Sequence, residues 1–244
     1  MARQWGCQTD DILDLSTGLH PDGAPIWLGE WLREHADLAT IYPDRDGEPA
    51  RSALAGEFGI KPSQLLITAG AQAAIEAIFP ALGWHSMAIR TPCYSEPLRC
   101  ARRSHCQVIT YSSGTPPPAD ILWITSPNNP CGRVSAPLRE GREQLWDESY
   151  APFAQRRAMG VSDNIVRIGS LTKTFCIPGL RLGYIVAAES TIAQLRHWLP
   201  PWPAATIALH LVAQLLPEAD RRDHAVVAAR QRLTTLLNRH NWLI

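Results

Sequence analysis

The chain has 244 residues, of which 45% are hydrophobic and 19% charged, and its formal net charge is zero. This is an ordinary globular composition, and the balanced charge gives no indication of a nucleic-acid partner or a membrane surface. Residues 1–7 lack the apolar core of a signal peptide, and no stretch approaches the roughly 20 apolar residues of a membrane span. The cysteines form no C-x-x-C pair and the histidines no H-E-x-x-H, so we expect reduced thiols, no metal site and a cytoplasmic protein.

Short apolar runs rich in β-branched residues alternate with helical patterns along the middle of the chain. In chain order we expect a helix at 26–34, strand 65–68, helix 71–82, strand 86–90, helix 96–104, strands 107–111, 121–125, 165–168 and 182–187, and helices 204–216 and 220–239, with Pro217 between the last two. The alternation predicts an α/β fold with a mostly parallel central sheet flanked by helices. We divide the chain into an irregular N-terminal segment (1–45), a large domain (46–190) and a helical C-terminal segment (191–244).

The stretches that follow the strands are the places to look for chemistry, because open α/β sheets bind ligands beyond the carboxyl ends of their strands. The first stretch is Thr68-Ala-Gly-Ala-Gln72, whose small residues and free helix-start amides favour a phosphate. The second is Ser126-Pro-Asn-Asn-Pro-Cys-Gly132, whose side-chain amides suit an anionic oxygen. Taken alone, the first also fits a plain strand–turn–helix junction and the second an ordinary turn.

Two later stretches carry an acid and a lysine. Asp147-Glu-Ser-Tyr150 follows a short run that ends in Trp146, and by itself it is typical of a solvated loop. Ser170-Leu-Thr-Lys173 follows a predicted strand, and Arg181 comes eight residues after the lysine. Lys173 is one of only two lysines in the chain, the other being Lys61. Each motif is weak alone, and the order of all four is the informative feature.

That order, a phosphate turn, an asparagine loop, Asp-x-x-Tyr, and Ser-x-x-Lys followed by an arginine, resembles the fold-type I pyridoxal-phosphate enzymes of the class I/II aminotransferase family. The resemblance runs from about Leu13 to Val186. It implies an aspartate-aminotransferase-like fold and pyridoxal 5'-phosphate as the cofactor.

The resemblance also implies a role for each residue around the cofactor ring. Lys173 would hold the cofactor as a Schiff base and later carry the α-proton of the substrate. Asp147 would face the pyridine nitrogen and keep it protonated, which makes the ring a better electron acceptor. Asn129 and Tyr150 would hydrogen-bond the phenolate oxygen of the ring, and Tyr94 would stack on its face.

For the cofactor phosphate, the resemblance implies a cradle made of backbone amides and side chains. The turn at Gly70, Ala71 and Gln72 would supply the amides, and Ser170 and Arg181 would complete the cradle, since a planar guanidinium meets phosphate oxygens with two donors. In the family a tyrosine of the neighbouring subunit also reaches the phosphate. Tyr42 occupies the matching place, which implies a homodimer with shared active sites.

Two segments narrow the resemblance further. Leu13-Asp-Leu-Ser-Thr-Gly-Leu-His-Pro21 resembles the N-terminal segment of the threonine-phosphate decarboxylases of cobalamin synthesis, which convert O-phospho-threonine to aminopropanol phosphate. Residues 170–183 look like the lysine segment that these enzymes share with histidinol-phosphate aminotransferases. The implied reaction is decarboxylation of L-threonine O-3-phosphate, with His20 and Arg45 as candidate substrate anchors.

The chain departs from the family pattern in two places. The part after Arg181 is short, which implies a truncated C-terminal small domain, and nothing after Asn241 can supply the arginine with which relatives clamp the substrate carboxylate. The stretch between Asn129 and Asp147 is also short, without room for a full helix plus a strand. We therefore expect intact cofactor binding and altered substrate binding.

Three alternatives remain open at the level of the sequence. The chain could be an aminotransferase acting on histidinol phosphate or a similar amino acid, or a catalytically impaired homologue that keeps the cofactor. Ser170-x-x-Lys173 and Ser162-Asp-Asn164 also match serine β-lactamase motifs, but here their order is reversed and the Lys-Thr-Gly element is missing. A visible absorbance of the purified protein separates the cofactor hypotheses from the last one.

Overall fold

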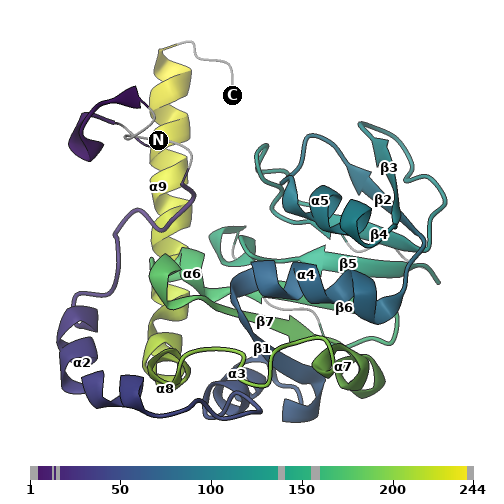
Figure 1. The fold of residues 1–244 in the computed structure, drawn as a ribbon. Coiled ribbons are helices and arrows are strands. Elements are labelled where there is room, and N and C mark those ends of the chain that lie inside the picture. The colour runs from purple at the N-terminus through teal and green to yellow at the C-terminus, as the bar shows by residue number, and fades with distance from the viewer. Residues whose placement is uncertain (1–4, 13, 15–16, 137–140, 155–159, 241–244) are drawn as a thin grey trace.

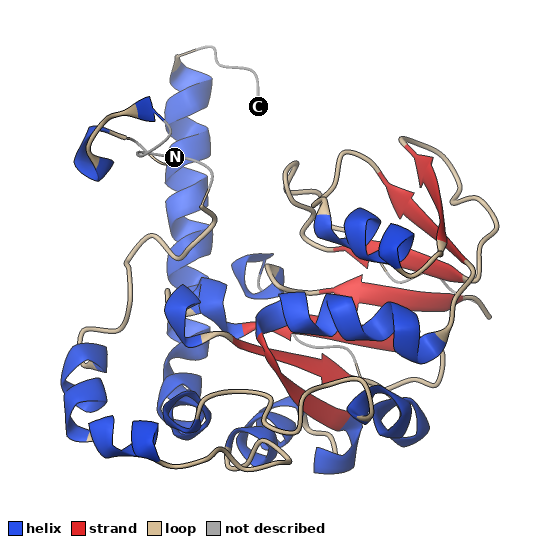
Figure 2. Ribbon diagram, in the orientation of Figure 1, coloured by secondary structure: helices blue, strands red, loops and turns tan. Residues whose placement is uncertain are grey.

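A computed structural model describes residues 5–12, 14, 17–136, 141–154 and 160–240. Within these residues, seven strands form one sheet in the order β1-β7-β6-β5-β4-β2-β3. The strands are β1 (Leu65–Ala69), β2 (Ser86–Arg90), β3 (Gln107–Tyr111), β4 (Ile121–Thr125), β5 (Glu143–Asp147), β6 (Ile165–Ser170) and β7 (Leu182–Val186). Neighbouring strands from β3 to β6 are parallel, and β7 is antiparallel to both β1 and β6. The expected mostly parallel sheet is confirmed (Figure 2).

Strand β5 was not expected from the sequence. It pairs in parallel with β4 and β6, so that Trp123 lies beside Leu145. Its residues Glu143-Gln-Leu-Trp lack the β-branched side chains that mark the other strands, and burial between two neighbours overrides this weak local preference. We expected too little room for both a full helix and a strand before Asp147, and among the described residues only the strand is present. No helix occupies the described residues between β4 and β5, and residues 137–140 lie outside the described part.

The helices lie close to their expected positions. The described α-helices are α2 (Leu28–Glu34), α3 (Ala50–Phe58), α4 (Gly70–Leu82), α5 (Glu96–Arg103), α6 (Leu171–Thr174), α7 (Glu189–Arg196), α8 (Thr206–Leu215) and α9 (Ala219–Arg239). Pro217 separates α8 from α9 as expected, within a short 3-10 turn. Helix α3 was missed; its glycine-containing sequence ends at Gly59, which takes a left-handed conformation (φ 64°) as helix C-caps often do.

Both faces of the sheet are buried, and alternate residues of each strand serve the two sides. Leu66 and Ile185 belong to the core beneath α4 and α7, while their neighbours Ile67 and Val186 pack with α3 and α8 on the opposite face. Helix α8 is therefore part of the same core as the sheet. Whether residues 191–244 form a segment distinct from the large domain stays a prediction.

Helix α9 is the longest described helix, and its C-terminal half extends beyond the body of the molecule (Figure 1). Its first turn lies next to α6, the short helix that carries Lys173. In the part of the chain that the structure describes, no helix combines the length and the apolar character that a membrane crossing requires.

Candidate active site

The carboxyl ends of β4, β5 and β6 meet at one edge of the sheet. Thr125 lies beside Asp147, and Asp147 beside Ile168, in the parallel register. A pocket of about 140 Å³ opens at this edge. It is lined by Ala71, Gln72, Ile75, Tyr94, Thr125, Asn129, Asp147, Ser149, Tyr150, Ser170, Thr172, Lys173 and Arg181. The four motifs that are far apart in the sequence thus contribute to one pocket.

Lys173 lies on the short helix α6 and is half-buried. Its Nζ is 5.8 Å from the centre of the Tyr150 ring. Desolvation and the nearby charge of Arg181 lower the pKa of Lys173, and the opposite charge of Asp147 offsets only part of this effect. A lowered pKa leaves more of the amine uncharged near neutral pH. The uncharged amine is the form that attacks a carbonyl carbon.

Asp147 ends β5 and is 5% exposed. Its Oδ1 accepts a hydrogen bond from the backbone N–H of Ser149 at 3.0 Å. Burial raises the pKa of Asp147, and the contacts with Ser149 and the charge of Lys173 oppose that rise. A buried carboxylate with so few partners is well suited to a cationic group in the pocket, because such a group would compensate its desolvation.

The start of α4 forms the other end of the pocket. Gly70 has a left-handed φ of 74°. The first amides of a helix have no intrahelical partner, and in α4 the N-cap side chain does not bond them either. A Cβ on Gly70 would lie 2.7 Å from Nη2 of Arg181, so the guanidinium packs directly on this turn. A Cβ on Gly183 would lie 2.6 Å from the amide nitrogen of Ala71, and the absence of a side chain at 183 lets α4 start close to β7. Amides and guanidinium together suit a phosphate.

Hydroxyl groups complete this end of the pocket. Ser170 is the N-cap of α6; its Oγ accepts from the backbone N–H of Thr172 at 3.3 Å and lies 2.7 Å from the Thr172 hydroxyl. Four residues that were not expected from the sequence also line the pocket: Ile75, Thr125, Ser149 and Thr172. For Thr172 a signal existed, since a hydroxyl two residues after an N-cap serine lies in the same first turn.

Tyr94, Asn129 and Tyr150 all line the pocket as expected, and Tyr94 is 39% exposed. Burial raises the pKa of both tyrosines, and the charge of Asp147 adds to the effect on Tyr150. Tyr150 also contacts the N-terminal segment, because a Cβ on Gly18 would lie 2.6 Å from its hydroxyl. The segment that contains the predicted Leu13–Pro21 motif therefore runs over the pocket, although residues 13, 15 and 16 lie outside the described residues.

Gly70 adjoins the lining residue Ala71 without lining the pocket itself, and three further predicted residues lie outside the pocket. Tyr42 is 78% exposed and contacts the Trp202 ring at a centroid distance of 5.0 Å. Arg45 is exposed and lines a separate cavity. His20 is buried, its Nδ1 accepts from the backbone N–H of Asp22 at 3.1 Å, and its Nε2 lies 2.9 Å from the backbone oxygen of Arg222. Their roles toward a partner subunit or a substrate stay predictions.

The model of the aminotransferase class I and II family matches residues 10–239. The chain belongs to this family. Enzymes of the family use pyridoxal 5'-phosphate as their cofactor. The fold is that of the aspartate-aminotransferase-like proteins.

Among individual relatives, the chain is 27% identical to the threonine-phosphate decarboxylase of Salmonella typhimurium, over 83% of this chain and 64% of that enzyme. It is 26% identical to the histidinol-phosphate aminotransferase of Stenotrophomonas maltophilia, over 80% of this chain and 64% of that enzyme. The chain thus spans less than two thirds of the length of both curated relatives. The crystal structure of L-threonine-O-3-phosphate decarboxylase from Porphyromonas gingivalis superimposes with a TM-score of 0.82 and 26% identity, and the match covers 93% of this chain and 77% of that one.

The pocket residues fit this cofactor. Its aldehyde needs an amine, which Lys173 provides, and its ring nitrogen needs an acid, which Asp147 provides. Its phosphate needs hydrogen-bond donors, which the amides at the start of α4 and the Arg181 guanidinium provide, and a Cβ on Gly70 or Gly183 would collide with Arg181 or with the Gly70–Ala71 backbone. The polar groups of the pocket therefore match the aldehyde, the ring nitrogen and the phosphate of the cofactor.

Proposed function

We propose that this chain binds pyridoxal 5'-phosphate covalently at Lys173 and decarboxylates L-threonine O-3-phosphate. The observation that carries the proposal is a single pocket that brings together Lys173, the buried Asp147, and Arg181 packed on the turn at the start of α4. The substrate is inferred from the similarity to threonine-phosphate decarboxylases in sequence and in structure.

The bound cofactor supplies an electron sink that weakens the bonds at the α-carbon of an amino acid. Asp147 would hold a proton on the ring nitrogen, and in return that positive charge would compensate the burial of the carboxylate. Arg181 and the amides at the start of α4 would fix the phosphate. Lys173, whose pKa is lowered by burial and by Arg181, would accept or deliver a proton at the α-carbon.

The orientation of the substrate decides which bond breaks, and groups remote from the α-carbon set that orientation. A phosphorylated substrate offers a second anion by which it can be held. We infer that the N-terminal segment at Gly18 and His20, which packs on Tyr150 through Gly18, helps to bind the phosphate of the substrate. Both ring nitrogens of His20 take part in hydrogen bonds within the chain, so the ring can bind the substrate only if it gives up one of these bonds.

We further propose a cytoplasmic homodimer in which Tyr42 reaches the phosphate of the partner subunit. Tyr42 contributes nothing to the pocket of its own chain, and its exposed ring is available to another molecule. Arg45 is likewise exposed and does not line the pocket of its own chain, so we propose that any contact of Arg45 with substrate occurs in the partner's site. No membrane or nucleic-acid partner enters this proposal.

The experiment compares two reactions of the cofactor-loaded protein. We expect carbon dioxide from O-phospho-threonine and little amino transfer to 2-oxoglutarate. The second candidate function is aminotransfer from histidinol phosphate, supported by a relative of nearly equal identity. Efficient keto-product formation from histidinol phosphate would replace the decarboxylase proposal with it. No product from either substrate, with cofactor bound at Lys173, would leave the chain as a cofactor-binding homologue without turnover.

A further inference from the structure

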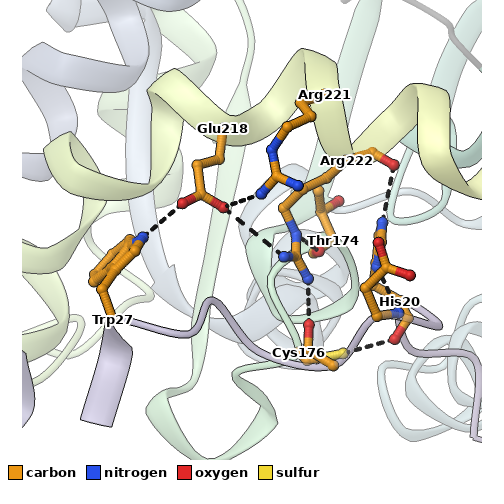
Figure 3. Close-up of polar contacts among 9 residues, drawn as sticks. His20, Trp27, Thr174, Cys176, Glu218, Arg221 and Arg222 are labelled. Carbon is orange, nitrogen blue, oxygen red and sulfur yellow. Dashed lines mark hydrogen bonds and ion pairs between the residues drawn. The ribbon is translucent and has the colours of Figure 1, made fainter. Parts of the chain in front are cut away.

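Arg222 lies in the first turn of α9 and is only 3% exposed. Its Nε donates to the backbone oxygen of Thr174 at 2.7 Å, and its Nη2 donates to the backbone oxygen of Gly23. The guanidinium carbon lies 5.8 Å from the centre of the Phe175 ring. One buried side chain thus connects α9 with the residues directly after Lys173 and with the N-terminal segment (Figure 3).

The N-terminal segment also forms hydrogen bonds with residues 173–176, through His20. The backbone N–H of His20 donates to the backbone oxygen of Lys173 at 3.1 Å. The thiol of Cys176 donates to the backbone oxygen of His20 at 3.1 Å. Since Nδ1 of His20 accepts a hydrogen bond from the backbone N–H of Asp22, Nε2 carries the ring hydrogen and donates to the backbone oxygen of Arg222. Residues 173–176 are therefore bonded to two segments that are remote in the sequence.

The contacts of Arg222 are not those of an ordinary ion pair. The nearest carboxylate oxygen is on Glu218, 3.9 Å from Nη1, and Glu218 also accepts from Trp27 at 2.6 Å and from Arg221 at 2.9 Å (Figure 3). The shorter bonds of Arg222 go to two backbone oxygens. A planar guanidinium with donors in fixed directions can reach both at once, which a lysine ammonium on a flexible stem cannot do in the same way.

We propose that Arg222 is a positioning residue, which fixes the backbone at 173–175 and so directs the Lys173 side chain into the pocket. The proposal rests on the proposed function, in which Lys173 is the cofactor lysine. Arg222 itself does not line that pocket. Its effect is transmitted through the Thr174 backbone oxygen and the Phe175 ring.

Arg221 provides a matched control. It is the neighbouring arginine on α9, its side chain is 67% exposed, and it pairs with Glu218. Both Arg222→Met and Arg221→Met remove one positive charge and one contact with Glu218. Only Arg222→Met removes the bonds to the backbone of residues 23 and 174.

The test uses cofactor-free protein. Reductive methylation with ¹³C-formaldehyde labels the chain's two lysines and its N-terminal amine, so NMR follows the Lys173 signal, identified by its loss in Lys173→Ala, with the exposed Lys61 as the internal reference. In the folded Arg222→Met protein we expect Lys173 to titrate at higher pH than in wild type, because a loosened segment relieves its burial and its proximity to Arg181. Lys61 should be unchanged in all proteins, and Lys173 should be unchanged in Arg221→Met. Arg222→Gln, which keeps one amide donor, should give an intermediate shift.

A second readout is the rate at which added pyridoxal phosphate becomes fixed to Lys173 under borohydride. We expect this rate to fall about 10–100-fold in Arg222→Met, the range typical of lost outer contacts around a reactive group. An unchanged Lys173 titration in a folded Arg222 variant would overturn the proposal. Loss of folding in both Arg222 variants, with Arg221→Met folded, would also overturn it, in favour of a purely structural role. If wild type fixes no cofactor at Lys173, the proposed function fails, while the titration still judges the positioning role separately.

Discussion

The buried guanidinium of Arg167 holds the carboxylate of Glu148, with Nε and Nη2 at 2.9 and 2.8 Å from Oε2. Glu148 follows Asp147 directly, yet it lines a different cavity on the other side of the lysine segment. The ion pair therefore leaves Asp147 as the acid that faces the cofactor pocket. Asp147 and Glu148 are neighbouring carboxylates with different surroundings: Glu148 is paired with Arg167, and Asp147 lines the pocket.

The first prediction follows for Asp147. Asp147→Asn should still fix pyridoxal phosphate at Lys173, since the amine and the phosphate cradle are intact. Turnover should fall about 100–1,000-fold, the cost seen when one preorganised electrostatic group is removed. Spectra of the loaded protein and product formation measure the two effects. Glu148→Gln is the control: it leaves the Arg167 charge buried without its carboxylate, so urea unfolding should show a loss of about 3–5 kcal/mol. Unchanged turnover in folded Asp147→Asn would reject the assignment.

The second prediction concerns Gly18. A methyl group at this position would lie 2.6 Å from the hydroxyl of Tyr150, so Gly18→Ala must displace the ring or the N-terminal segment. Overpacking of this kind costs about 1–3 kcal/mol, and we expect the cofactor dissociation constant to rise roughly tenfold. Gly29→Ala is the matched control, because the added carbon would have no atom within 4 Å apart from its chain neighbours and the backbone of its own helix. Equal cofactor affinity in the two variants would show that the segment over Tyr150 does not shape the pocket.

The third prediction concerns the pH dependence of stability. Burial and the charge of Asp220 raise the pKa of Asp223 to about 6 in the folded protein. Between its lower unfolded pKa and about 6, the folded state binds more protons, so stability decreases as pH rises through this window. Asp223→Asn cannot ionise, and after allowance for partial exposure it should stabilise the protein by about 1–2 kcal/mol at pH 7.5 relative to pH 4.5. Urea unfolding at the two pH values measures the difference, and an equal effect at both would refute the prediction.

The fourth prediction tests the shared active site. Lys173→Ala removes the cofactor lysine, and Tyr42→Phe removes the hydroxyl that is proposed to act on the partner subunit. In a mixed dimer of the two variants, one site combines the intact Lys173 with the intact Tyr42 of the other chain. That site should fix cofactor with wild-type affinity, although the Tyr42→Phe homodimer binds it more weakly. If the mixed dimer shows only the weak affinity of Tyr42→Phe, the tyrosine acts within its own chain.

The sequence predicted those parts of the fold in which local pattern and burial agree. Strand β4 is rich in β-branched residues and is buried on both faces. Strand β5, with Glu143-Gln-Leu-Trp, was missed because it lacks β-branched residues and its burial depends on tertiary packing of Leu145 and Trp146 that no local pattern shows. Lys173 and Asp147 could be predicted because their motifs follow the phosphate turn and the asparagine loop in the order that is typical of the family. Gly18 could not, since the absence of a side chain matters only where another segment approaches. The bonds of Arg222 join residues 48 and 199 positions away, and no local pattern carries such information.

The assignment of Lys173 as the cofactor lysine can be tested directly, because Lys61 is the chain's only other lysine. Protein loaded with pyridoxal phosphate is reduced with borohydride, digested and mapped by mass spectrometry, together with Lys173→Ala and Lys61→Ala. We predict the adduct on the peptide that contains Lys173 in wild type and in Lys61→Ala, and no adduct in Lys173→Ala. An adduct on Lys61, or an adduct that persists in Lys173→Ala, would contradict the assignment of the site.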